Sequence, residues 1–288
     1  MQASTFTAAD INARSGTVES MHPIERLRWV ARSPEGDDSL VAAEAADALA
    51  SFADDPAGLV IASRRLIERR PAAGPLWWLA SRVLCALDPG FEAMDAAADL
   101  EGDRTAVALA GDLPGGTVAI VGWPDQASSA LRMRARMGGE VPVTPDRVVV
   151  VPTGRDSWGC VDWLQGHAVD ARLLRDGEVV TAGRRCVLAL LEASAVGPDS
   201  FVATTGSAEL AAAAREAKRP VWLVAGVGRI LPAPLYDALV KRIAGDDRVE
   251  VVPLKVVDEI VGPAGPVPRA QLARPACPVA AELLRFNG

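Results

Sequence analysis

The sequence is poor in the residue types from which many catalytic and metal centres are built. Its 288 residues include four cysteines and two histidines. The cysteines lie far apart and form no CxxC pair, so we expect reduced thiols and neither a zinc site nor a disulfide framework. Two histidines leave little material for His-based catalysis, and neither a metal nor a cofactor is expected. The residues concerned are Cys85, Cys160, Cys186, Cys277, His22 and His167.

Long apolar runs and an excess of basic charge are also missing. No stretch approaches the roughly 18 uninterrupted apolar residues of a membrane helix, so no membrane segment is expected. Residues 1–20 show no basic segment followed by an apolar one, which predicts a cytoplasmic location. The net charge of −7 argues against nucleic-acid binding, because neutralising phosphates requires a basic face.

The hydrophobic pattern divides the chain into four parts. Residues 1–20 are polar and without periodicity, which predicts a disordered extension. Residues 21–112 repeat their apolar positions every three or four residues and are predicted to form a helical domain. Residues 113–262 alternate short apolar strands with helices, and residues 263–288 form a Pro-rich tail expected to lie extended over the surface. The prediction is an α/β protein in which an N-terminal helical domain precedes a Rossmann-like, doubly wound, mostly parallel sheet.

The spacing of apolar residues and the positions of prolines also predict individual helices and strands. Pro56 and Pro75 stand where helices are expected to begin, since a first-turn proline loses no hydrogen bond. Strands are expected in the apolar runs after Gly116, Asp146 and Val169. The segment VEVVPL at 249–254 is also expected to be a strand. The segment VVDEIV at 256–261 is expected to form a final helix.

The central unit of the sheet is predicted between Leu188 and Arg229. It consists of the buried strand LALL, a loop of small polar residues, an Ala-rich helix and the buried strand VWLVAG. Ligands of such a βαβ unit bind at the C-terminal ends of the strands. The loop places Gly206 and Ser207 before the helix, whose N-terminal amides suit an anion. The alternative is that Thr205 or Ser207 only caps the helix.

Known nucleotide cradles and nucleophile motifs are absent. The chain has no GxGxxG after the first strand and no GxxxxGK[ST], which excludes the dinucleotide and Walker motifs. GRDSWG, which contains Ser157, is not a nucleophile elbow, and Cys160 and His167 are interpreted as packing and capping residues. Arg155 and Asp156 follow a predicted strand, where they form either ligand contacts or an internal ion pair.

Two further features have open interpretations. The Gly- and Pro-containing segment 134–145 either covers a site as a lid or only connects two elements. Trp77 and Trp78 are interpreted as one core residue and one domain-contact residue rather than a nucleic-acid patch. Arg70 precedes Pro71 and is therefore expected to be extended, so that it points from the helical domain toward the sheet.

Several segments resemble one known family. ERRPAAGPLWWL at 68–79 is similar to the Arg-Pro-Thr-Ala-x-x-Leu-x-Trp segment of methylthioribose-1-phosphate isomerases. EASAVGPDSFVATTGSAELAAAA at 192–214 is similar to a loop and helix shared by these isomerases and the alpha, beta and delta regulatory subunits of translation initiation factor 2B. RPVWLVAGVGRI at 219–230 and VVPLKVVDEIVGPAGPVP at 251–268 match later segments of that family. The resemblance implies a helical domain followed by a Rossmann-like domain.

The chain departs from the isomerase pattern at the positions that carry the reaction. Ser194 stands where the resemblance places the catalytic aspartate, and Ala203-Thr204 replace an Asn-Lys pair that helps to hold the sugar phosphate. The catalytic cysteine position falls near Gly122 and Trp123. Moving a proton between two sugar carbons needs a positioned acid and base. Isomerisation is therefore not expected, and the pocket is expected to persist without it.

The leading hypothesis is a non-catalytic, initiation-factor-2B-like binding or regulatory protein that holds a small phosphorylated ligand, a sugar phosphate or a nucleotide, and forms a homo-oligomer such as a dimer. One alternative is a sugar-phosphate enzyme in which Glu192 or Asp156 acts as acid or base. Another is a protein-interaction module with an empty pocket and another protein as partner. The expected ligand-binding residues are Arg70, Gly122, Trp123, Arg155, Asp156, Glu192, Ser194, Thr204, Thr205, Gly206, Ser207 and Arg229.

Overall fold

Four helices form the N-terminal part of the chain in the computed structural model, which describes residues 38–137, 145–154, 156–175 and 177–285. Pro56 and Pro75 lie in the first turns of α5 and α6, as expected. Asp55 and Asp88 cap α5 and α7 by accepting a hydrogen bond from a first-turn amide. The helices are α4 (Asp38–Ala50), α5 (Pro56–Arg69), α6 (Gly74–Cys85) and α7 (Pro89–Glu101).

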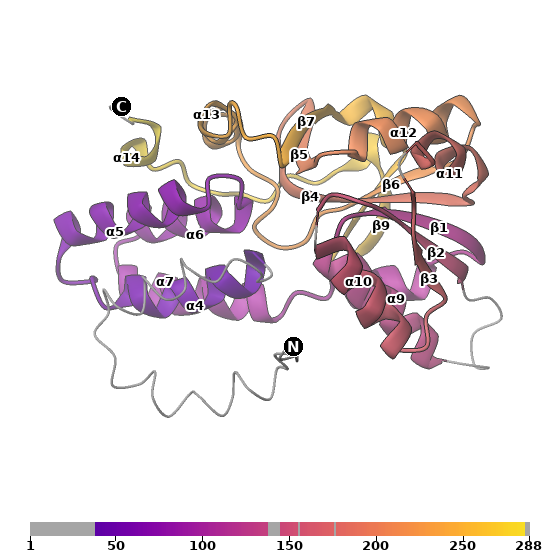
Figure 1. Ribbon diagram of the computed structural model, residues 1–288. Helices are drawn as coiled ribbons and strands as arrows, with labels where there is room; N and C mark the ends of the chain where they lie inside the picture. Colours follow the sequence, from indigo (N-terminus) through magenta and orange to yellow (C-terminus); the bar gives the residue numbers. More distant parts are fainter. Residues whose placement is uncertain (1–37, 138–144, 155, 176, 286–288) are drawn as a thin grey trace, which may run out of the picture.

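The core of the helical part is built around α6. Trp77 is fully buried and donates its indole N–H to the carbonyl of Pro71 at 2.9 Å. Leu49, Ile67 and Leu79 complete the centre of the cluster, each with 0% exposure. The cluster also includes side chains from α13 (Ala233–Arg242) and α14 (Ala281–Leu284), which lie far along the chain but beside α5 and α6 in Figure 1.

The second part of the molecule is a sheet with the strand order β3-β2-β1-β4-β6-β8-β9. All neighbours in this order are parallel except β8 and β9, which are antiparallel. The predicted α/β class with a mostly parallel, Rossmann-like sheet is confirmed. The strands are β1 (Gly116–Val121), β2 (Pro145–Val151), β3 (Ala171–Leu173), β4 (Leu188–Val196), β6 (Val221–Val224), β8 (Glu259–Gly262) and β9 (Gly265–Pro268).

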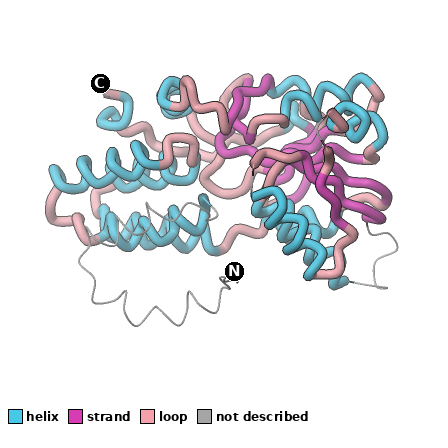
Figure 2. Tube along the Cα trace, viewed as in Figure 1, coloured by secondary structure: helices cyan, strands magenta, loops and turns pink. Residues whose placement is uncertain are grey.

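Helices cover both faces of this sheet, as Figure 2 shows. Alternate residues of β1 face opposite ways: Val118 and Ile120 pack on one side, and Ala119 and Val121 pack on the other. The first side is covered by α8 (Thr105–Asp112), α9 (Asp125–Met137) and α10 (Asp156–Gly166). The second side is covered by α11 (Val179–Arg185) and α12 (Ser207–Glu216).

Three expected elements differ from the structure. The polar loop of the central unit contains β5 (Ser200–Thr204), which pairs antiparallel with β4 and with β7 (Val249–Pro253). The predicted helix VVDEIV is a short 3₁₀ turn, η2 (Leu254–Val256), followed by β8, because its spacing of apolar residues fits a strand equally well. The Pro-rich tail begins with β9 rather than with extended surface chain.

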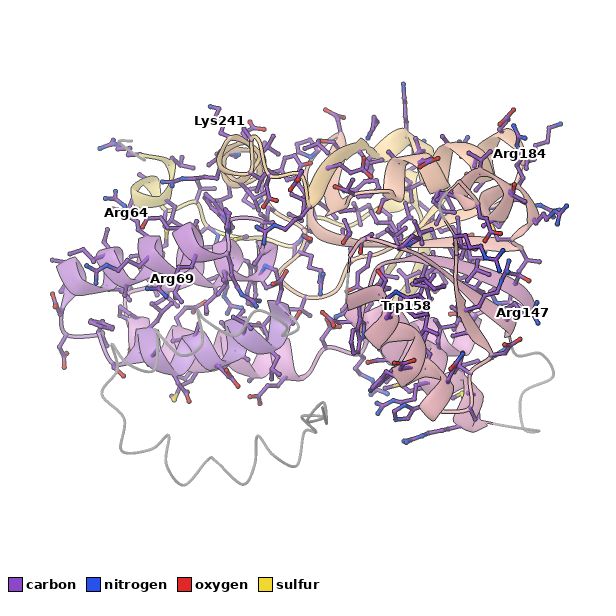
Figure 3. All side chains as sticks on the ribbon, in the orientation of Figure 1. Arg64, Arg69, Arg147, Trp158, Arg184 and Lys241 are labelled. Carbon is purple, nitrogen blue, oxygen red and sulfur yellow. The ribbon has the colours of Figure 1, made fainter. Side chains whose placement is uncertain are left out.

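The rest of the tail crosses back from the sheet part to the helical part. We call residues 272–280 the strap; they follow η3 (Arg269–Gln271) and precede α14. Ser81 in α6 donates a hydrogen bond to the carbonyl of Pro278 at 2.6 Å and accepts one from the amide of Ala280 at 2.8 Å. Beyond the strap, Arg64 donates to the carbonyl of Glu282, and Figure 3 shows Arg64 beside α14. The C-terminal segment thus joins the two parts.

Some predictions concern residues outside the described ranges. The expected disordered extension 1–20, most of the lid candidate (138–144) and Arg155 belong to this group. In the described part of the chain, no helix has the length and apolar character needed to cross a membrane.

Candidate functional site

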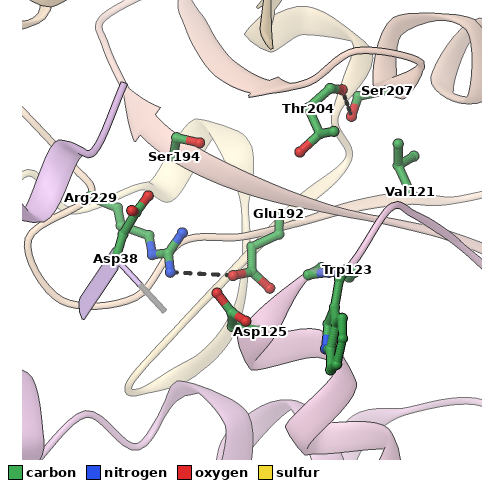
Figure 4. A pocket seen from close by; sticks show the side chains of 10 residues that line it. Asp38, Val121, Trp123, Asp125, Glu192, Ser194, Thr204, Ser207 and Arg229 are labelled. Atoms are coloured by element: carbon green, nitrogen blue, oxygen red, sulfur yellow. Dashed lines mark hydrogen bonds and ion pairs between the residues drawn. The ribbon is translucent and has the colours of Figure 1, made fainter. Parts of the chain in front are cut away.

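A polar pocket lies between the C-terminal ends of the parallel strands and the start of α4 (Figure 4). Its volume is about 120 Å³, which is smaller than the roughly 300–1,000 Å³ of typical sites for organic ligands. The walls come from β1 and α9, from β4, from the β5–α12 connection and from the loop after β6. The lining residues are Asp38, Val121, Trp123, Pro124, Asp125, Glu192, Ser194, Thr204, Ser207 and Arg229.

Glu192 is the most constrained side chain of this pocket. It occupies the last parallel pair between β4 and β6, opposite Val224, so its carboxylate lies at the C-terminal edge of the sheet. Its Oε2 accepts hydrogen bonds from the amides of Gln126 and Ala127, both at 3.0 Å, in the first turn of α9. A helix N-terminus stabilises a negative charge, because its free amides and the helix dipole point toward it. Glu192 therefore fills the anion position of α9 with a group of the protein itself.

Arg229 completes the environment of this carboxylate. Its Nη2 lies 3.3 Å from Oε1 of Glu192, and its Nη1 donates to the carbonyl of Ala193 at 2.6 Å. The exposed fractions of the Arg229 and Glu192 side chains are 4% and 8%. A charge pair buried to this degree is held by electrostatics with little screening by solvent. The pair joins β4 to the loop that follows β6, and Figure 4 shows it at the back of the pocket.

Ser194 lies on the same side of β4 as Glu192. It is the extra residue of a β-bulge, since Ala193 and Ala195 pair with the consecutive residues Ala203 and Val202 of β5. The bulge directs Ser194 into the pocket, where Figure 4 shows it above Arg229. The position at which the resemblance places an acid thus carries a hydroxyl that faces the pocket.

The turn after β1 brings Trp123 to the pocket and leaves no room for a side chain at Gly122. Gly122 has φ of 62°, and an added Cβ would lie 2.6 Å from Oγ1 of Thr153. Trp123 packs against Gly159 of α10 and keeps 42% of its surface exposed. An indole therefore forms the outer wall where the resemblance places a nucleophilic cysteine.

The β5–α12 connection differs from a simple anion cradle. Gly206 has φ of 102° and starts α12 without a side-chain cap. The hydroxyl of Ser207 donates to the carbonyl of Thr204 at 2.7 Å, and both residues line the pocket. The amide of Ala208 donates to Oε1 of Glu250 at 2.9 Å. A carboxylate from β7 thus binds the N-terminus of α12, where we expected either a ligand or a hydroxyl cap.

Thr205 and Arg70, two further expected site residues, lie outside the lining of the pocket. Thr205 is exposed, and its hydroxyl donates to the carbonyl of Asp247 at 2.7 Å. Arg70 forms an ion pair with Asp38 at 3.0 Å, and Asp38 lines the pocket. Arg70 therefore lies in the helical part and contacts Asp38, a residue of the pocket lining. Arg155 is outside the described residues, and Asp156 begins α10.

Ser157, Cys160 and His167 do not form a catalytic group. Ser157 is buried and accepts a hydrogen bond from the amide of Thr153 at 2.9 Å. His167 contacts the carbonyl of Trp163 through Nδ1 at 2.7 Å. Cys160 is fully buried, and burial raises the pKa of its thiol to about 11. Within the described ranges, no group of three or more His, Cys, Asp or Glu side chains could hold a metal ion.

Three acidic residues of this region were missed by the sequence interpretation. Asp38 and Asp125 stand in the first turns of α4 and α9, where acidic residues are common for reasons unrelated to ligands. Glu250 lies in the strand VEVVP, which was expected from the sequence without a role for its carboxylate. The pairing of β7 with β5 places Glu250 beside the start of α12. This pairing was not predicted, because β5 was interpreted as a loop.

Comparisons with known proteins agree on the fold. No family model matches the chain, and no curated protein sequence matches it. The structure of translation initiation factor eIF-2B from Pyrococcus horikoshii matches with a TM-score of 0.70 at 15% identity, over 85% of this chain and 96% of that one. The tetrameric eIF2B-beta2-delta2 complex from Chaetomium thermophilum gives 0.68 at 18% identity, with 90% and 95% covered.

The 5-methylthioribose 1-phosphate isomerase of Pyrococcus horikoshii also matches, with a TM-score of 0.60 at 18% identity over 85% of this chain and 84% of that one. The chain therefore has the fold that eIF2B subunits share with this isomerase. The resemblance identified from the sequence is confirmed at the level of the fold, and identities this low extend no further than the fold.

The buried position of Cys160 leads to a testable prediction. With a pKa of about 11 and no exposed surface, its thiol is almost wholly protonated and shielded at pH 8. Native protein treated with iodoacetamide should be alkylated at the exposed Cys85 and remain unmodified at Cys160, as measured by peptide mass spectrometry. Protein unfolded in guanidinium serves as the control, in which both residues should react. Rapid native labelling of Cys160 would contradict its assignment as a packing residue.

Proposed function

We propose that the protein is a non-catalytic binding or regulatory protein with an eIF2B-type fold, and that its polar pocket holds a small ligand. The observation that carries this proposal is the arrangement around Glu192. A general base needs a free lone pair and a general acid needs a proton that it can give up. In Glu192, Oε2 accepts hydrogen bonds from two backbone amides and Oε1 faces the guanidinium of Arg229, so we assign this carboxylate a structural role.

The other positions of isomerase chemistry support the same conclusion. Ser194 lacks an acidic proton at physiological pH, and the Gly122–Trp123 turn carries no nucleophile. Asp125 lies beside Glu192 in Figure 4, and a pair of carboxylates can act as acid and base where both are free to exchange protons. Glu192 is instead engaged by two backbone amides and by Arg229. The pocket therefore retains groups for binding rather than for reaction.

The lining indicates a ligand that is rich in hydroxyl groups. Asp38, Asp125 and Glu192 supply carboxylates that accept hydrogen bonds, and Ser194 and Thr204 supply hydroxyls. Arg229 is the guanidinium that lines this pocket in the described part of the chain, and it suits a single anionic group. Sugar phosphates and nucleoside monophosphates combine hydroxyls with such a group, so we propose these two classes as ligands. The cytoplasmic location expected from the sequence remains a prediction.

Thermal-shift measurements with panels of sugar phosphates and nucleoside monophosphates test the proposal. At millimolar concentration a ligand should raise Tm, because binding to the native state alone stabilises it. The variant Thr204→Val should weaken this ligand roughly fivefold through the loss of one hydrogen bond. Thr205→Val is the matched control, because its hydroxyl faces Asp247 outside the pocket, and it should bind like the wild type.

The same samples distinguish the competing functions. No shift with any member of either panel would contradict the ligand-binding proposal and favour an interaction module. Conversion of an aldose phosphate to a ketose phosphate by the wild type, abolished in Glu192→Gln, would contradict the non-catalytic assignment. We expect binding without turnover.

We also propose that the protein forms a homodimer. One matching structure is described as a tetrameric complex of eIF2B subunits, and this chain exposes large apolar side chains such as Trp158, at 62%, and Val251, at 45%. Mass photometry at nanomolar to micromolar concentration should show a species of twice the 30.1 kDa chain mass. A strictly monomeric protein across this range would contradict the assembly proposal.

A further inference from the structure

A second and larger cavity lies at the junction of the two parts of the molecule, separate from the polar pocket. Its volume is about 540 Å³, within the range of sites for organic ligands of roughly 300–1,000 Å³. Its walls are α6 and α7, the loop after β6, and the β8–β9 hairpin, and the strap forms the remaining side. The lining includes Trp78, Arg82, Asp99, Val227, Ala264 and Arg274.

The interior of this cavity is apolar because the chain places small or apolar residues around it. Trp78 packs closely against the loop after β6, where a Cβ on Gly228 would lie 3.2 Å from its ring. Val227, Ile260, Val267 and Leu272 supply aliphatic surface. The cavity opens to solvent on one side. Its apolar lining favours an apolar occupant, because such an occupant would remove this surface from water.

Few hydrogen bonds hold the strap in place beside the cavity. Arg274 donates through Nη2 to the carbonyls of Gly197 and Pro198, each at 3.0 Å, and Ser81 holds the far end at Pro278 and Ala280. Residues 275 and 276, between these anchors, are exposed although they line the cavity. The strap thus spans the opening and leaves access for a small molecule.

Of the two arginines in the cavity lining, Arg82 is paired with carboxylates of the described residues and Arg274 is not. Arg82 and Asp99 form an ion pair at 2.6 Å, and Arg82 also contacts Glu92 and Asp95, so its guanidinium is fully engaged. Arg274 has no ion pair with any described residue, and its Nε and Nη1 donate to no described acceptor. A guanidinium with two unused donors binds a carboxylate well. The cavity therefore combines an apolar interior with one available cation at its edge.

We propose that this cavity is a ligand site for a small amphipathic carboxylate, with the hydrocarbon part inside the cavity and the carboxylate on Arg274. The site goes beyond the function proposed for the polar pocket. The two cavities share a wall, because Ala225, Gly226, Val227, Gly228 and Ile230 line the larger one. Arg229, in the same loop, lines the polar pocket. An occupant of the larger site therefore contacts the loop that carries the partner of Glu192.

Octanoate and octan-1-ol serve as matched probes in fluorescence titrations of the intact chain. Both should change the emission of Trp78, and octanoate should bind more tightly than the alcohol. Arg274→Gln should weaken octanoate about tenfold more than it weakens octan-1-ol, because only octanoate loses a charged hydrogen bond while both probes lose the strap anchor. Arg269→Gln, a nearby exposed arginine outside the cavity lining, is the matched control and should bind both probes like the wild type.

A second variant tests the location. Ala264 is exposed in the β8–β9 turn and lines the cavity, so Ala264→Trp should fill space without disturbing the fold and weaken both probes at least tenfold. Circular dichroism and Tm confirm that each variant is folded.

The proposal is overturned if neither probe binds, if Arg274→Gln and Arg269→Gln behave alike, or if Thr204→Val in the polar pocket weakens octanoate as much as Ala264→Trp. The last result would place octanoate in the polar pocket, whereas the proposed function depends on phosphorylated ligands alone.

Discussion

The ion pair between Glu192 and Arg229 is the interaction on which the arrangement of the polar pocket depends. It joins three segments that are distant in the sequence: the edge of β4, the first turn of α9 and the loop after β6. A buried carboxylate without partners is strongly unfavourable, so the pair holds these segments at fixed distances from one another. Asp103 extends the same connection, since its Oδ2 accepts hydrogen bonds from the side chain of Gln126 and the amide of Val227.

This constraint also determines the chemistry that is open to the pocket. Both helix N-termini that point toward it are bound by carboxylates of the protein, α9 by Glu192 and α12 by Glu250. These positions in other proteins often hold the phosphate of a ligand. In this chain carboxylates of the protein occupy them, and the pocket lining also includes Arg229, the hydroxyls of Ser194 and Thr204, and the indole of Trp123. The fold is one that eIF2B subunits share with an isomerase, and we propose that this pocket binds a ligand without reaction.

Much of this could be predicted from the sequence, for identifiable reasons. Helices with prolines in their first turns and strands with continuous apolar runs have periods that a sequence displays directly. Glu192, Ser194, Thr204, Ser207 and Arg229 were expected near one another from the ends of predicted strands and from the family resemblance, and the structure places all five around one pocket. The short strand β5 was missed, because SFVAT stands between turn residues and its partners β4 and β7 are set by tertiary pairing.

The acidic residues Asp38, Asp125 and Glu250 could not be predicted, since their role comes from contacts across long sequence separations. A double-mutant cycle on Glu192→Gln and Arg229→Met, with free energies of unfolding from urea titration, measures how strongly these two side chains depend on each other. We predict a coupling energy of at least about 1 kcal/mol, because each single change leaves a buried partner uncompensated. Additive effects within about 0.3 kcal/mol would contradict it, since Glu192 would then be free of Arg229 and available for acid–base chemistry.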